Sequence, residues 1–261
     1  MAAKTPHVIH DSVASKLRRM NLYAAVLHLG SAIAILTLSN GYSMPIVGSY
    51  IQGEPGSTTY QIATLGHLPI GLLCALFLFL SSIAHLWVAS YRGFPRYIDD
   101  LSNNRNIARW VEYSISSSIM IVLISVICSV RDIVTLAALF FVNVSMILFG
   151  WLQEKYEVPG GGMLPFWFGC IAGVVPWAAI VWLLIAPGDV GSAHAPGFVY
   201  GIVASLFIFF NCFALNQYLQ YKQIGKWKNY LYGERIYIIL SFVAKSALAW
   251  QIFAGVLAQS H

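Results

Sequence analysis

One lysine lies inside the last long apolar segment of this chain, in the stretch Ser241-Phe-Val-Ala-Lys245-Ser-Ala-Leu-Ala-Trp250-Gln251. Residues 236–258 hold no other charged side chain, and the length of this segment matches a bilayer. An unpaired ammonium at such depth costs roughly 2.5–3.5 kcal/mol on insertion scales. Burial makes a lysine lose its proton more easily, and the free amine forms a Schiff base with an aldehyde. We therefore predict that Lys245 anchors a ligand covalently. The alternatives are a structural pair with a carboxylate, or a side chain that snorkels to the interface.

The composition is typical of a polytopic membrane protein. Of the 261 residues, 58% are hydrophobic and 10% are charged, which is too apolar for a soluble domain of this length. We expect one domain over residues 1–261, an all-α membrane bundle of seven helices. The four cysteines lie inside the apolar segments without metal-type spacing, and we interpret them as small buried residues. The seven predicted spans are 18–40, 66–91, 102–129, 132–156, 163–186, 196–222 and 231–258.

The distribution of basic residues predicts the orientation. Thirteen of the 15 lysines and arginines fall on the face that holds the N-terminus, Arg131 falls on the other face, and Lys245 lies within a span. The positive-inside rule then places residues 1–17 in the cytoplasm and the C-terminus outside, in a multi-pass protein of the cell (plasma) membrane. Topology explains the net charge of +5, so we expect no nucleic acid partner.

The longest outside loop, about 41–65, carries two β-prone runs around a Gly/Pro turn. This pattern predicts a short extracellular β-hairpin, with an irregular loop as the alternative. An exposed edge strand of such a hairpin could pair across a dimer. We further predict a tight turn at Arg131-Asp132 and a flexible loop at Pro159–Gly162.

Glu112 is the acid best placed to balance a cation on Lys245. The other nine acids lie in tails, in loops or near span ends. If the third span starts near Ser102, Glu112 lies about 15 Å inside it. A carboxylate and a cation at similar depth lower each other's cost. We predict that Glu112 is the counterion, and the alternative is a pair with Arg109 at the cytoplasmic rim.

Other polar residues recur at helical spacing around this pair. Ser241 precedes the lysine by one turn, and Ser116 follows the acid by one turn. His28 and His85 lie in the same half of the bilayer as the acid, where they could hold or relay a proton. The alternative is that each histidine is a hydrogen-bonded packing residue. Three further amides are either part of the site or contacts between helices. They are Asn143, Asn211 and Gln217.

A slot for a long conjugated aldehyde should be flat and aromatic. The alternative for each candidate is a role in the core or in the interface belt, because 14% of the chain is aromatic. The candidates for the walls and floor of the slot are Tyr113, Met146, Ile147, Gly150, Trp167, Phe168, Phe210, Gln217 and Trp250.

Seven spans with a lysine in the seventh and a carboxylate in the third resemble the microbial rhodopsins. Those proteins ordinarily place the N-terminus outside, whereas the heliorhodopsin family is inverted. Nearly the whole chain from about residue 18 is similar to that family. The blocks that carry the resemblance are Arg109-Trp-Val-Glu112-Tyr-Ser, Ser145-Met-Ile-Leu-Phe-Gly-Trp-Leu-Gln-Glu-Lys155, Leu164-Pro-Phe-Trp-Phe-Gly-Cys170, Pro196-Gly-Phe-Val-Tyr-Gly201 and Ala244-Lys-Ser-Ala-Leu-Ala-Trp-Gln251.

The resemblance implies a rhodopsin-like bundle with all-trans retinal bound to Lys245 and Glu112 as its counterion. It also implies isomerisation about the C13=C14 bond in light and a slow photocycle. His28 and His85 match family histidines that line a polar cavity, to which we also assign Asn143. A homodimer in the lipid bilayer is implied as well. The expected function is that of a non-enzymatic light sensor, with an unknown cytoplasmic signalling protein as a possible partner.

The sequence also argues against pumping. Outward proton pumps carry a second acid four residues before the lysine and a carboxyl donor eleven residues after the counterion. Here these positions are Ser241 and Leu123, so a vectorial relay lacks its stations. The main alternative is a light-gated or light-driven ion (proton) transporter. More distant alternatives are a non-photoactive seven-helix receptor and an enzyme that uses Lys245 as a Schiff-base catalyst.

Overall fold

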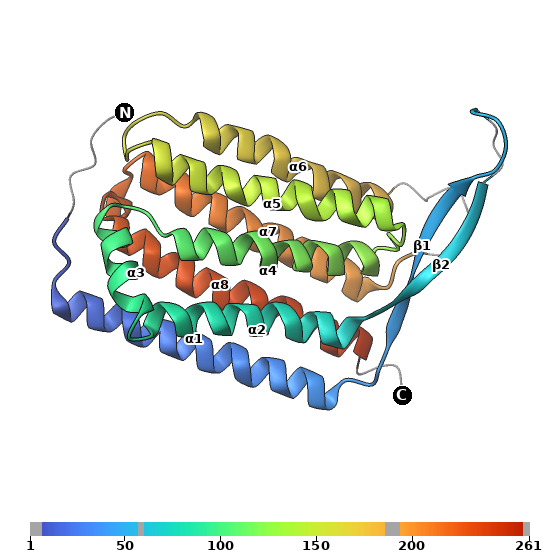
Figure 1. Cartoon of the computed structure of the whole chain (residues 1–261), viewed down its shortest axis with the longest axis horizontal. Coiled ribbons are helices and arrows are strands. Elements are labelled where there is room, and N and C mark those ends of the chain that lie inside the picture. The colour runs from blue at the N-terminus through green and yellow to red at the C-terminus, as the bar shows by residue number, and fades with distance from the viewer. Residues whose placement is uncertain (1–6, 57–59, 186–193, 258–261) are drawn as a thin grey trace.

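The computed structural model describes residues 7–56, 60–185 and 194–257, which form a helical bundle with a β-hairpin at one end (Figure 1). The helices run side by side along the long axis, and a short helix lies across the other end. The elements in chain order are α1 (Asp11–Leu38), β1 (Ser43–Ile51), β2 (Tyr60–Pro69), α2 (Ile70–Ala89), α3 (Gly93–Ser102), α4 (Ile107–Ile127), α5 (Ile133–Tyr156), α6 (Leu164–Ile185), α7 (Gly197–Tyr221), η2 (Gly225–Lys228), α8 (Tyr230–Ile252) and η3 (Phe253–Leu257).

Within these described ranges, seven helices are long and apolar enough to cross a membrane, namely α1, α2, α4, α5, α6, α7 and α8. The predicted number of spans and the all-α class are thereby confirmed. Some predicted ends were wrong. The first helix begins at Asp11 and not near residue 18, so the N-terminal segment is partly helical. The third span begins at Ile107, five residues later than expected.

Side-chain caps set the start of three spans. Asn106 and Asn229 accept hydrogen bonds from the backbone N–H of Arg109 and Leu231 at the starts of α4 and α8. Asp132 caps α5 by accepting from both the backbone N–H and the hydroxyl of Thr135. These bonds lower the pKa of Asp132 below its ordinary value. The predicted turn at Arg131-Asp132 therefore ends in a cap.

Helix α3 was not predicted as an element. It crosses the bundle at the end where α1 begins, opposite the hairpin (Figure 1). Its buried face consists of Gly93, Tyr97 and Leu101. A Cβ at Gly93 would lie 1.9 Å from the carbonyl oxygen of Trp87, so only glycine allows this approach. Sequence periodicity missed α3 because a ten-residue helix with a narrow apolar face resembles a polar loop.

The hairpin confirms the expected pair of strands. β1 and β2 are antiparallel, with pairs from Ser43↔Pro69 to Ile51↔Tyr60 and an irregularity between Ile46 and Val47. The second strand continues to Pro69, beyond the loop predicted for residues 41–65. The Val47 N–H donates to the Arg131 carbonyl at 2.9 Å, which ties the base of the hairpin to the α4–α5 connection.

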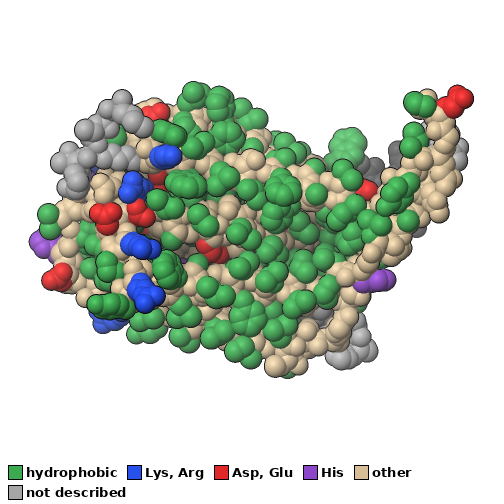
Figure 2. Space-filling model, in the orientation of Figure 1, with side chains coloured by type: hydrophobic (Ala, Val, Ile, Leu, Met, Phe, Trp, Pro, Cys, Tyr) green, Lys and Arg blue, Asp and Glu red, His purple; other side chains and the backbone are tan. Residues whose placement is uncertain are grey.

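Hydrophobic side chains cover the middle of the bundle, whereas the lysines and arginines seen in this view gather at the end where α3 lies (Figure 2). We call this the α3 end and the opposite end the hairpin end. The main apolar core lies in the hairpin half, where Phe77, Leu123, Ile124 and Leu248 are fully buried. The charged interior described next lies between this core and the α3 end.

Candidate functional site

Lys245 of α8 and Glu112 of α4 form an ion pair in the bundle. The Lys245 Nζ atom lies 2.6 Å from Glu112 Oε1, and the two side chains are 4% and 8% exposed. Nζ also donates to Ser81 Oγ of α2 at 2.6 Å, and Ser81 Oγ lies 2.6 Å from Glu112 Oε1. Removing one partner of such a pair leaves an uncompensated charge, which costs about 3–5 kcal/mol. Three helices therefore meet at one amine, and sequence reasoning had missed Ser81.

The serines of the predicted site are fully buried. Ser116 lies on the same face of α4 as Glu112 and lines the large cavity described below. Ser241 lies one turn before Lys245 on α8, but it is not among the residues that line that cavity. Ser116 therefore borders the ligand space, whereas Ser241 is buried outside its lining.

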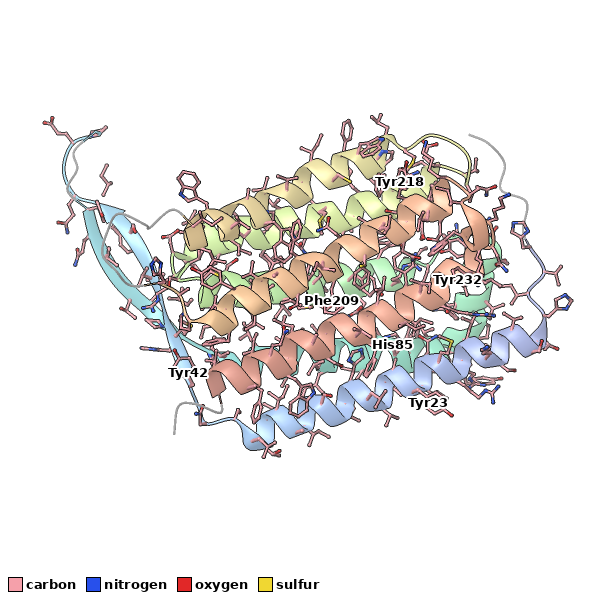
Figure 3. All side chains as sticks on the ribbon, turned by 180° about the vertical axis from the view of Figure 1, so that it is seen from behind. Tyr23, Tyr42, His85, Phe209, Tyr218 and Tyr232 are labelled. Carbon is pink, nitrogen blue, oxygen red and sulfur yellow. The ribbon has the colours of Figure 1, made fainter. Side chains whose placement is uncertain are left out.

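The two predicted histidines lie together. The rings of His28 on α1 and His85 on α2 stack with centroids 5.7 Å apart. His85 Nδ1 lies 2.7 Å from Asn21 Oδ1, and Figure 3 shows His85 between the helices. His28 is fully buried, and neither of its ring nitrogens has a hydrogen-bond partner within the described residues. Buried polar atoms are seldom left unpaired, so His28 calls for a partner such as water.

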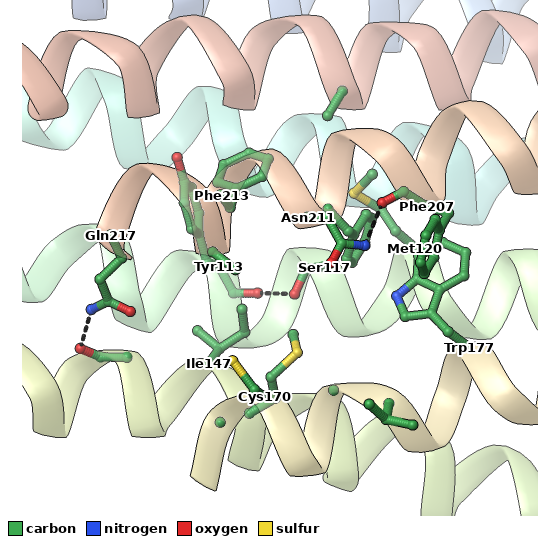
Figure 4. A pocket seen from close by; sticks show the side chains of 18 of the residues that line it. Tyr113, Ser117, Met120, Ile147, Cys170, Trp177, Phe207, Asn211, Phe213 and Gln217 are labelled. Carbon is green, nitrogen blue, oxygen red and sulfur yellow. Dashed lines mark hydrogen bonds between the residues drawn. The ribbon is translucent and has the colours of Figure 1, made fainter. Parts of the chain in front are cut away.

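A cavity of about 510 Å³ lies between α4, α5, α6, α7 and α8 (Figure 4), and Lys245 is one of the residues that line it. Its volume lies within the range of small-molecule sites, and its walls are mostly apolar and aromatic, as in such sites. Gln217 is one of its few polar residues, and its Nε2 donates to the Gly150 carbonyl at 3.0 Å. The predicted residues that line this cavity are Tyr113, Ser116, Met146, Ile147, Gly150, Phe210 and Gln217.

Three predicted aromatic residues do not line the cavity. Trp167 and Phe168 of α6 are 51% and 46% exposed on the outside of the bundle. Phe166 takes the wall position, because successive helical residues point about 100° apart. Trp250 of α8 is 40% exposed and contacts Phe253, since five helical residues turn it about 140° away from Lys245. The aromatic wall residues that were missed are Trp110, Phe166, Trp177, Phe207, Phe213 and Tyr237.

The assignment of Asn143 to a polar cavity with the histidines was wrong. Its Nδ2 atom donates to Ser117 Oγ at 2.8 Å and to Ser118 Oγ at 3.0 Å, and it lines neither cavity described here. Asn143 ties α5 to α4, which is the alternative that we had considered for the buried amides.

Close packing at glycines shapes the cavity. A Cβ on Gly150 would lie 2.5 Å from the Trp110 ring, and one on Gly173 would lie 2.7 Å from Met146 Sδ. Real Cβ atoms do not approach so closely, and a larger side chain would push these walls inward. The cavity therefore keeps its shape because α5 has glycine at the contact with the Trp110 ring, and α6 has glycine at the contact with the Met146 thioether.

Arg109 of α4 lies one turn before Glu112 and forms ion pairs with two other carboxylates, Glu154 of α5 and Glu234 of α8. Arg109, Glu154 and Glu234 are 6%, 0% and 1% exposed. We call these three residues the Arg109 cluster. Both acids lie near the ends of their helices, as expected, but they are buried and pair with Arg109. Arg109 pairs with them and not with Glu112, so the alternative of a pair between Arg109 and Glu112 at the rim is not what the structure shows. The partners lie 45 and 125 residues away from Arg109 in the chain, so no local spacing could pair them.

Neutral donors complete the Arg109 cluster. Glu154 accepts from Trp110 Nε1 at 2.5 Å, the Asn106 N–H at 3.0 Å and Tyr230 Oη at 3.1 Å. Glu234 accepts from Asn106 Nδ2 at 2.8 Å and from Tyr97 Oη of α3 at 3.0 Å. The Arg109 guanidinium carbon lies 3.9 Å from the Tyr237 ring centroid. The cluster thus joins α3, α4, α5 and α8.

Comparison with known proteins identifies the family and the fold of the chain. A sequence model described as heliorhodopsin matches residues 17–257. No curated protein sequence matches the chain significantly. Three solved structures share the fold. Cyanorhodopsin from the cyanobacterium Tolypothrix sp. has a TM-score of 0.63 at 13% identity and covers 96% of this chain and 97% of its own. Exiguobacterium sibiricum rhodopsin has a TM-score of 0.60 at 14% sequence identity. A light-driven proton pump from Leptosphaeria maculans has a TM-score of 0.61 at 12% sequence identity. Each of these two alignments covers 95% of this chain and 98% of the other chain.

Proposed function

The chain belongs to the heliorhodopsin family, and on that premise we propose that it is a light-sensing photoreceptor. In this proposal, all-trans retinal is bound to Lys245 through a Schiff base, and Glu112 is the counterion. The observation that carries it is the ion pair of 2.6 Å between these residues, in which Lys245 also lines a cavity of about 510 Å³. In this proposal the protein is a retinal-binding photoreceptor and not an enzyme.

The residues present fit a long polyene. The lysine that would hold the ligand lines the cavity, together with aromatic walls formed by Tyr113, Trp177 and Phe210. Gly150 and Gly173 let Trp110 and Met146 approach the ligand space. When bound, retinal supplies absorption of visible light and an isomerisation driven by that light.

Glu112 and Ser81 act on the charge of the Lys245 nitrogen. The carboxylate stabilises the protonated nitrogen across 2.6 Å, and Ser81 Oγ lies within hydrogen-bond distance of both. Because the side chains are nearly inaccessible, little water screens this interaction. A small change in the position of the nitrogen therefore changes the balance of charge at Glu112.

We infer a sensor with a slow photocycle and without pumping. Neither pump position carries an acid: Ser241 is fully buried beside Lys245, and Leu123 is fully buried in the apolar core of the hairpin half. Phe77 and Leu248 belong to the same core. A proton that leaves Lys245 toward the hairpin end would meet apolar side chains, so transport across the bundle is not supported.

The proposal includes an orientation and partners. We place the α3 end in the cytoplasm because the visible lysines and arginines gather there (Figure 2). The protein would then be a multi-pass protein of the plasma membrane with an extracellular hairpin. The hairpin exposes Tyr50, Ile51 and Ile62, which offer a contact for a homodimer. A cytoplasmic signalling protein would bind at the α3 end.

Colour and pH recording test this function. Purified protein incubated with all-trans retinal should gain a visible band, and Glu112→Gln should move that band to longer wavelength because the charge on the nitrogen loses its counterion. Glu154→Gln is the matched control and should leave the band in place. Cells in weak buffer should show no sustained pH change in light. Absence of colour would reject the receptor, and a sustained pH change that an uncoupler abolishes would establish the transporter instead.

A further inference from the structure

A small cavity of about 30 Å³ lies between Glu112 and the Arg109 cluster. It has room for about two waters, because one water needs roughly 10–15 Å³ of such space. The buried Arg109 Nε atom has no hydrogen-bond partner within the described residues, and water in this cavity would supply one. The polar residues that line the cavity are Asn21, His85, Asn106, Arg109, Glu112, Tyr113, Glu234 and Tyr237.

Of the two carboxylates that pair with Arg109, Glu234 lines this cavity and Glu154 does not. Each oxygen of Glu154 accepts two donors: Arg109 and Tyr230 at Oε1, and Asn106 and Trp110 at Oε2. A proton on Glu154 would have to displace one of them. Among the described residues, Glu234 Oε2 accepts from Arg109 alone, so this oxygen retains a lone pair for a proton.

The charge of the cluster favours uptake of one proton. With both carboxylates ionised, one guanidinium faces two negative charges, and the net charge is one negative charge within the bundle. Uncompensated charge removed from water is costly. A proton on Glu234 brings the sum to zero and leaves the pair of Arg109 with Glu154 intact. The titratable and polar groups around Glu234 come from every element packed against it. They are Asn21 of α1, His85 of α2, Tyr97 of α3, the cap residue Asn106, Arg109, Glu112 and Tyr113 of α4, Glu154 of α5, and Tyr237 of α8.

We propose that Glu234 holds the proton that leaves the Lys245 nitrogen in light, an inference that rests on the proposed function. In the dark the nitrogen carries the proton, and Glu234 is a carboxylate. In light the N–H bond breaks, the nitrogen becomes neutral, and an O–H bond forms at Glu234. Glu112 lies 2.6 Å from Nζ and shares the small cavity with His85 and Glu234, which provides the path. The same proton returns in the dark, so none crosses the membrane.

Infrared difference spectroscopy of retinal-loaded protein in lipid vesicles tests this assignment. When light shifts the visible band of the wild type, a new carboxylic-acid C=O band should appear. Glu234→Gln should remove it, Glu234→Asp should move its frequency, and the matched variant Glu154→Gln should keep it. Persistence of the band in Glu234→Gln, its equal loss in Glu154→Gln, or its absence from the wild type would overturn the assignment. If Glu234→Gln takes up no retinal, the frequency in Glu234→Asp decides.

A measurement without pigment separates this inference from the proposed function. In retinal-free protein, acid titration followed by infrared absorption should show a carboxylic-acid band that Glu234→Gln lacks and Glu154→Gln retains. If the wild type gains no visible band with retinal, the photoreceptor proposal fails, but the titration of the retinal-free protein still tests whether Glu234 takes up a proton. Identical titrations in the wild type and Glu234→Gln would remove Glu234 as a proton site, whatever the colour of the protein.

Discussion

Arg109 and Glu112 lie one turn apart on α4, yet they belong to two different kinds of charge site. Glu112 pairs with one lysine, the charges balance, and the lysine borders a cavity of about 510 Å³. Arg109 pairs with two carboxylates that together accept seven hydrogen bonds, four at Glu154 and three at Glu234. The first site has an open side where a ligand can react with the amine. The second site is held by protein donors and joins four helices, and Arg109 and Glu234 border the small cavity of about 30 Å³.

This comparison predicts that substitutions at the first site abolish pigment binding, whereas substitutions at the second site lower stability. The largest expected effect is that of replacing Lys245. Lys245→Ala should abolish the visible band of protein incubated with retinal, because no amine remains in the lining of the cavity. Arg109→Gln should still gain colour. Absorption spectra of both variants, prepared in parallel, check this. Colour in Lys245→Ala would mean that another group holds the pigment.

The Arg109 cluster should dominate stability. Arg109→Gln leaves two buried carboxylates without their cation and should destabilise the fold by about 3–5 kcal/mol. Arg105→Gln is the matched control, because Arg105 is 39% exposed in its pair with Asp100 and should cost only about 0–1 kcal/mol. Thermal melting of the solubilised protein, followed by loss of helical signal, measures both. Equal melting temperatures for the two variants would contradict the distinction.

Tyr97 connects the Arg109 cluster to α3, and removing its hydroxyl should destabilise the fold less than removing the Arg109 cation does. Tyr97→Phe removes the hydroxyl that donates to Glu234 at 3.0 Å, and a hydrogen bond to a charged group contributes about 1.5–3 kcal/mol. Tyr23→Phe is the control, because Tyr23 lies on the outer face of α1 and is 69% exposed (Figure 3). Hydrogen exchange of the α3 backbone should accelerate in Tyr97→Phe only. Unchanged protection would show that α3 is held by its apolar face alone.

The cavity wall gives the smallest of these effects. Gly150→Ala places a methyl group where the Trp110 ring now lies 2.5 Å from a Cβ position, and such overpacking costs about 1–3 kcal/mol. The displaced ring should slow retinal uptake and shift the visible band. Gly201→Ala, which meets nothing within 4 Å, should change neither. Uptake rates measured by stopped-flow absorption compare the two, and equal rates would remove Gly150 from the wall.

The same contrast explains what the sequence could predict. Lys245 stood out because it is a lone charge deep in an apolar span, and a lone charge at that depth must find a partner. Glu112 was chosen for a depth of about 15 Å, but α4 begins at Ile107, only five residues before Glu112, so that depth was overestimated.

Glu154 and Glu234 lie nearer to span ends, where acids normally meet water, so nothing local distinguished them from surface residues. Tyr97 of α3 covers Glu234, whereas Trp110 and Tyr230 enclose Glu154, so the burial of both acids depends on partners far away in the chain. Helix α3 was missed because ten residues of mixed polarity do not stand out in a search for long apolar spans.

The predicted pocket residues line the cavity where they share a helical face with the site, and elsewhere they point away from it. Met146, Ile147 and Gly150 line the cavity because three- and four-residue steps keep them on one side of α5. Trp167 and Trp250 were chosen for their size, but they point outward. In a chain that is 14% aromatic, ring size does not tell core from surface, whereas helical phase relative to a known site residue does.

The most direct test of the central claim is to locate the pigment on the chain. Protein loaded with all-trans retinal is treated with borohydride to reduce the Schiff base to a stable amine, then digested and analysed by mass spectrometry. We predict that the retinyl mass lies on Lys245, in the peptide that contains Ala244 and Ser246. A retinyl group found on another lysine, or on none while the protein is coloured, would contradict the account.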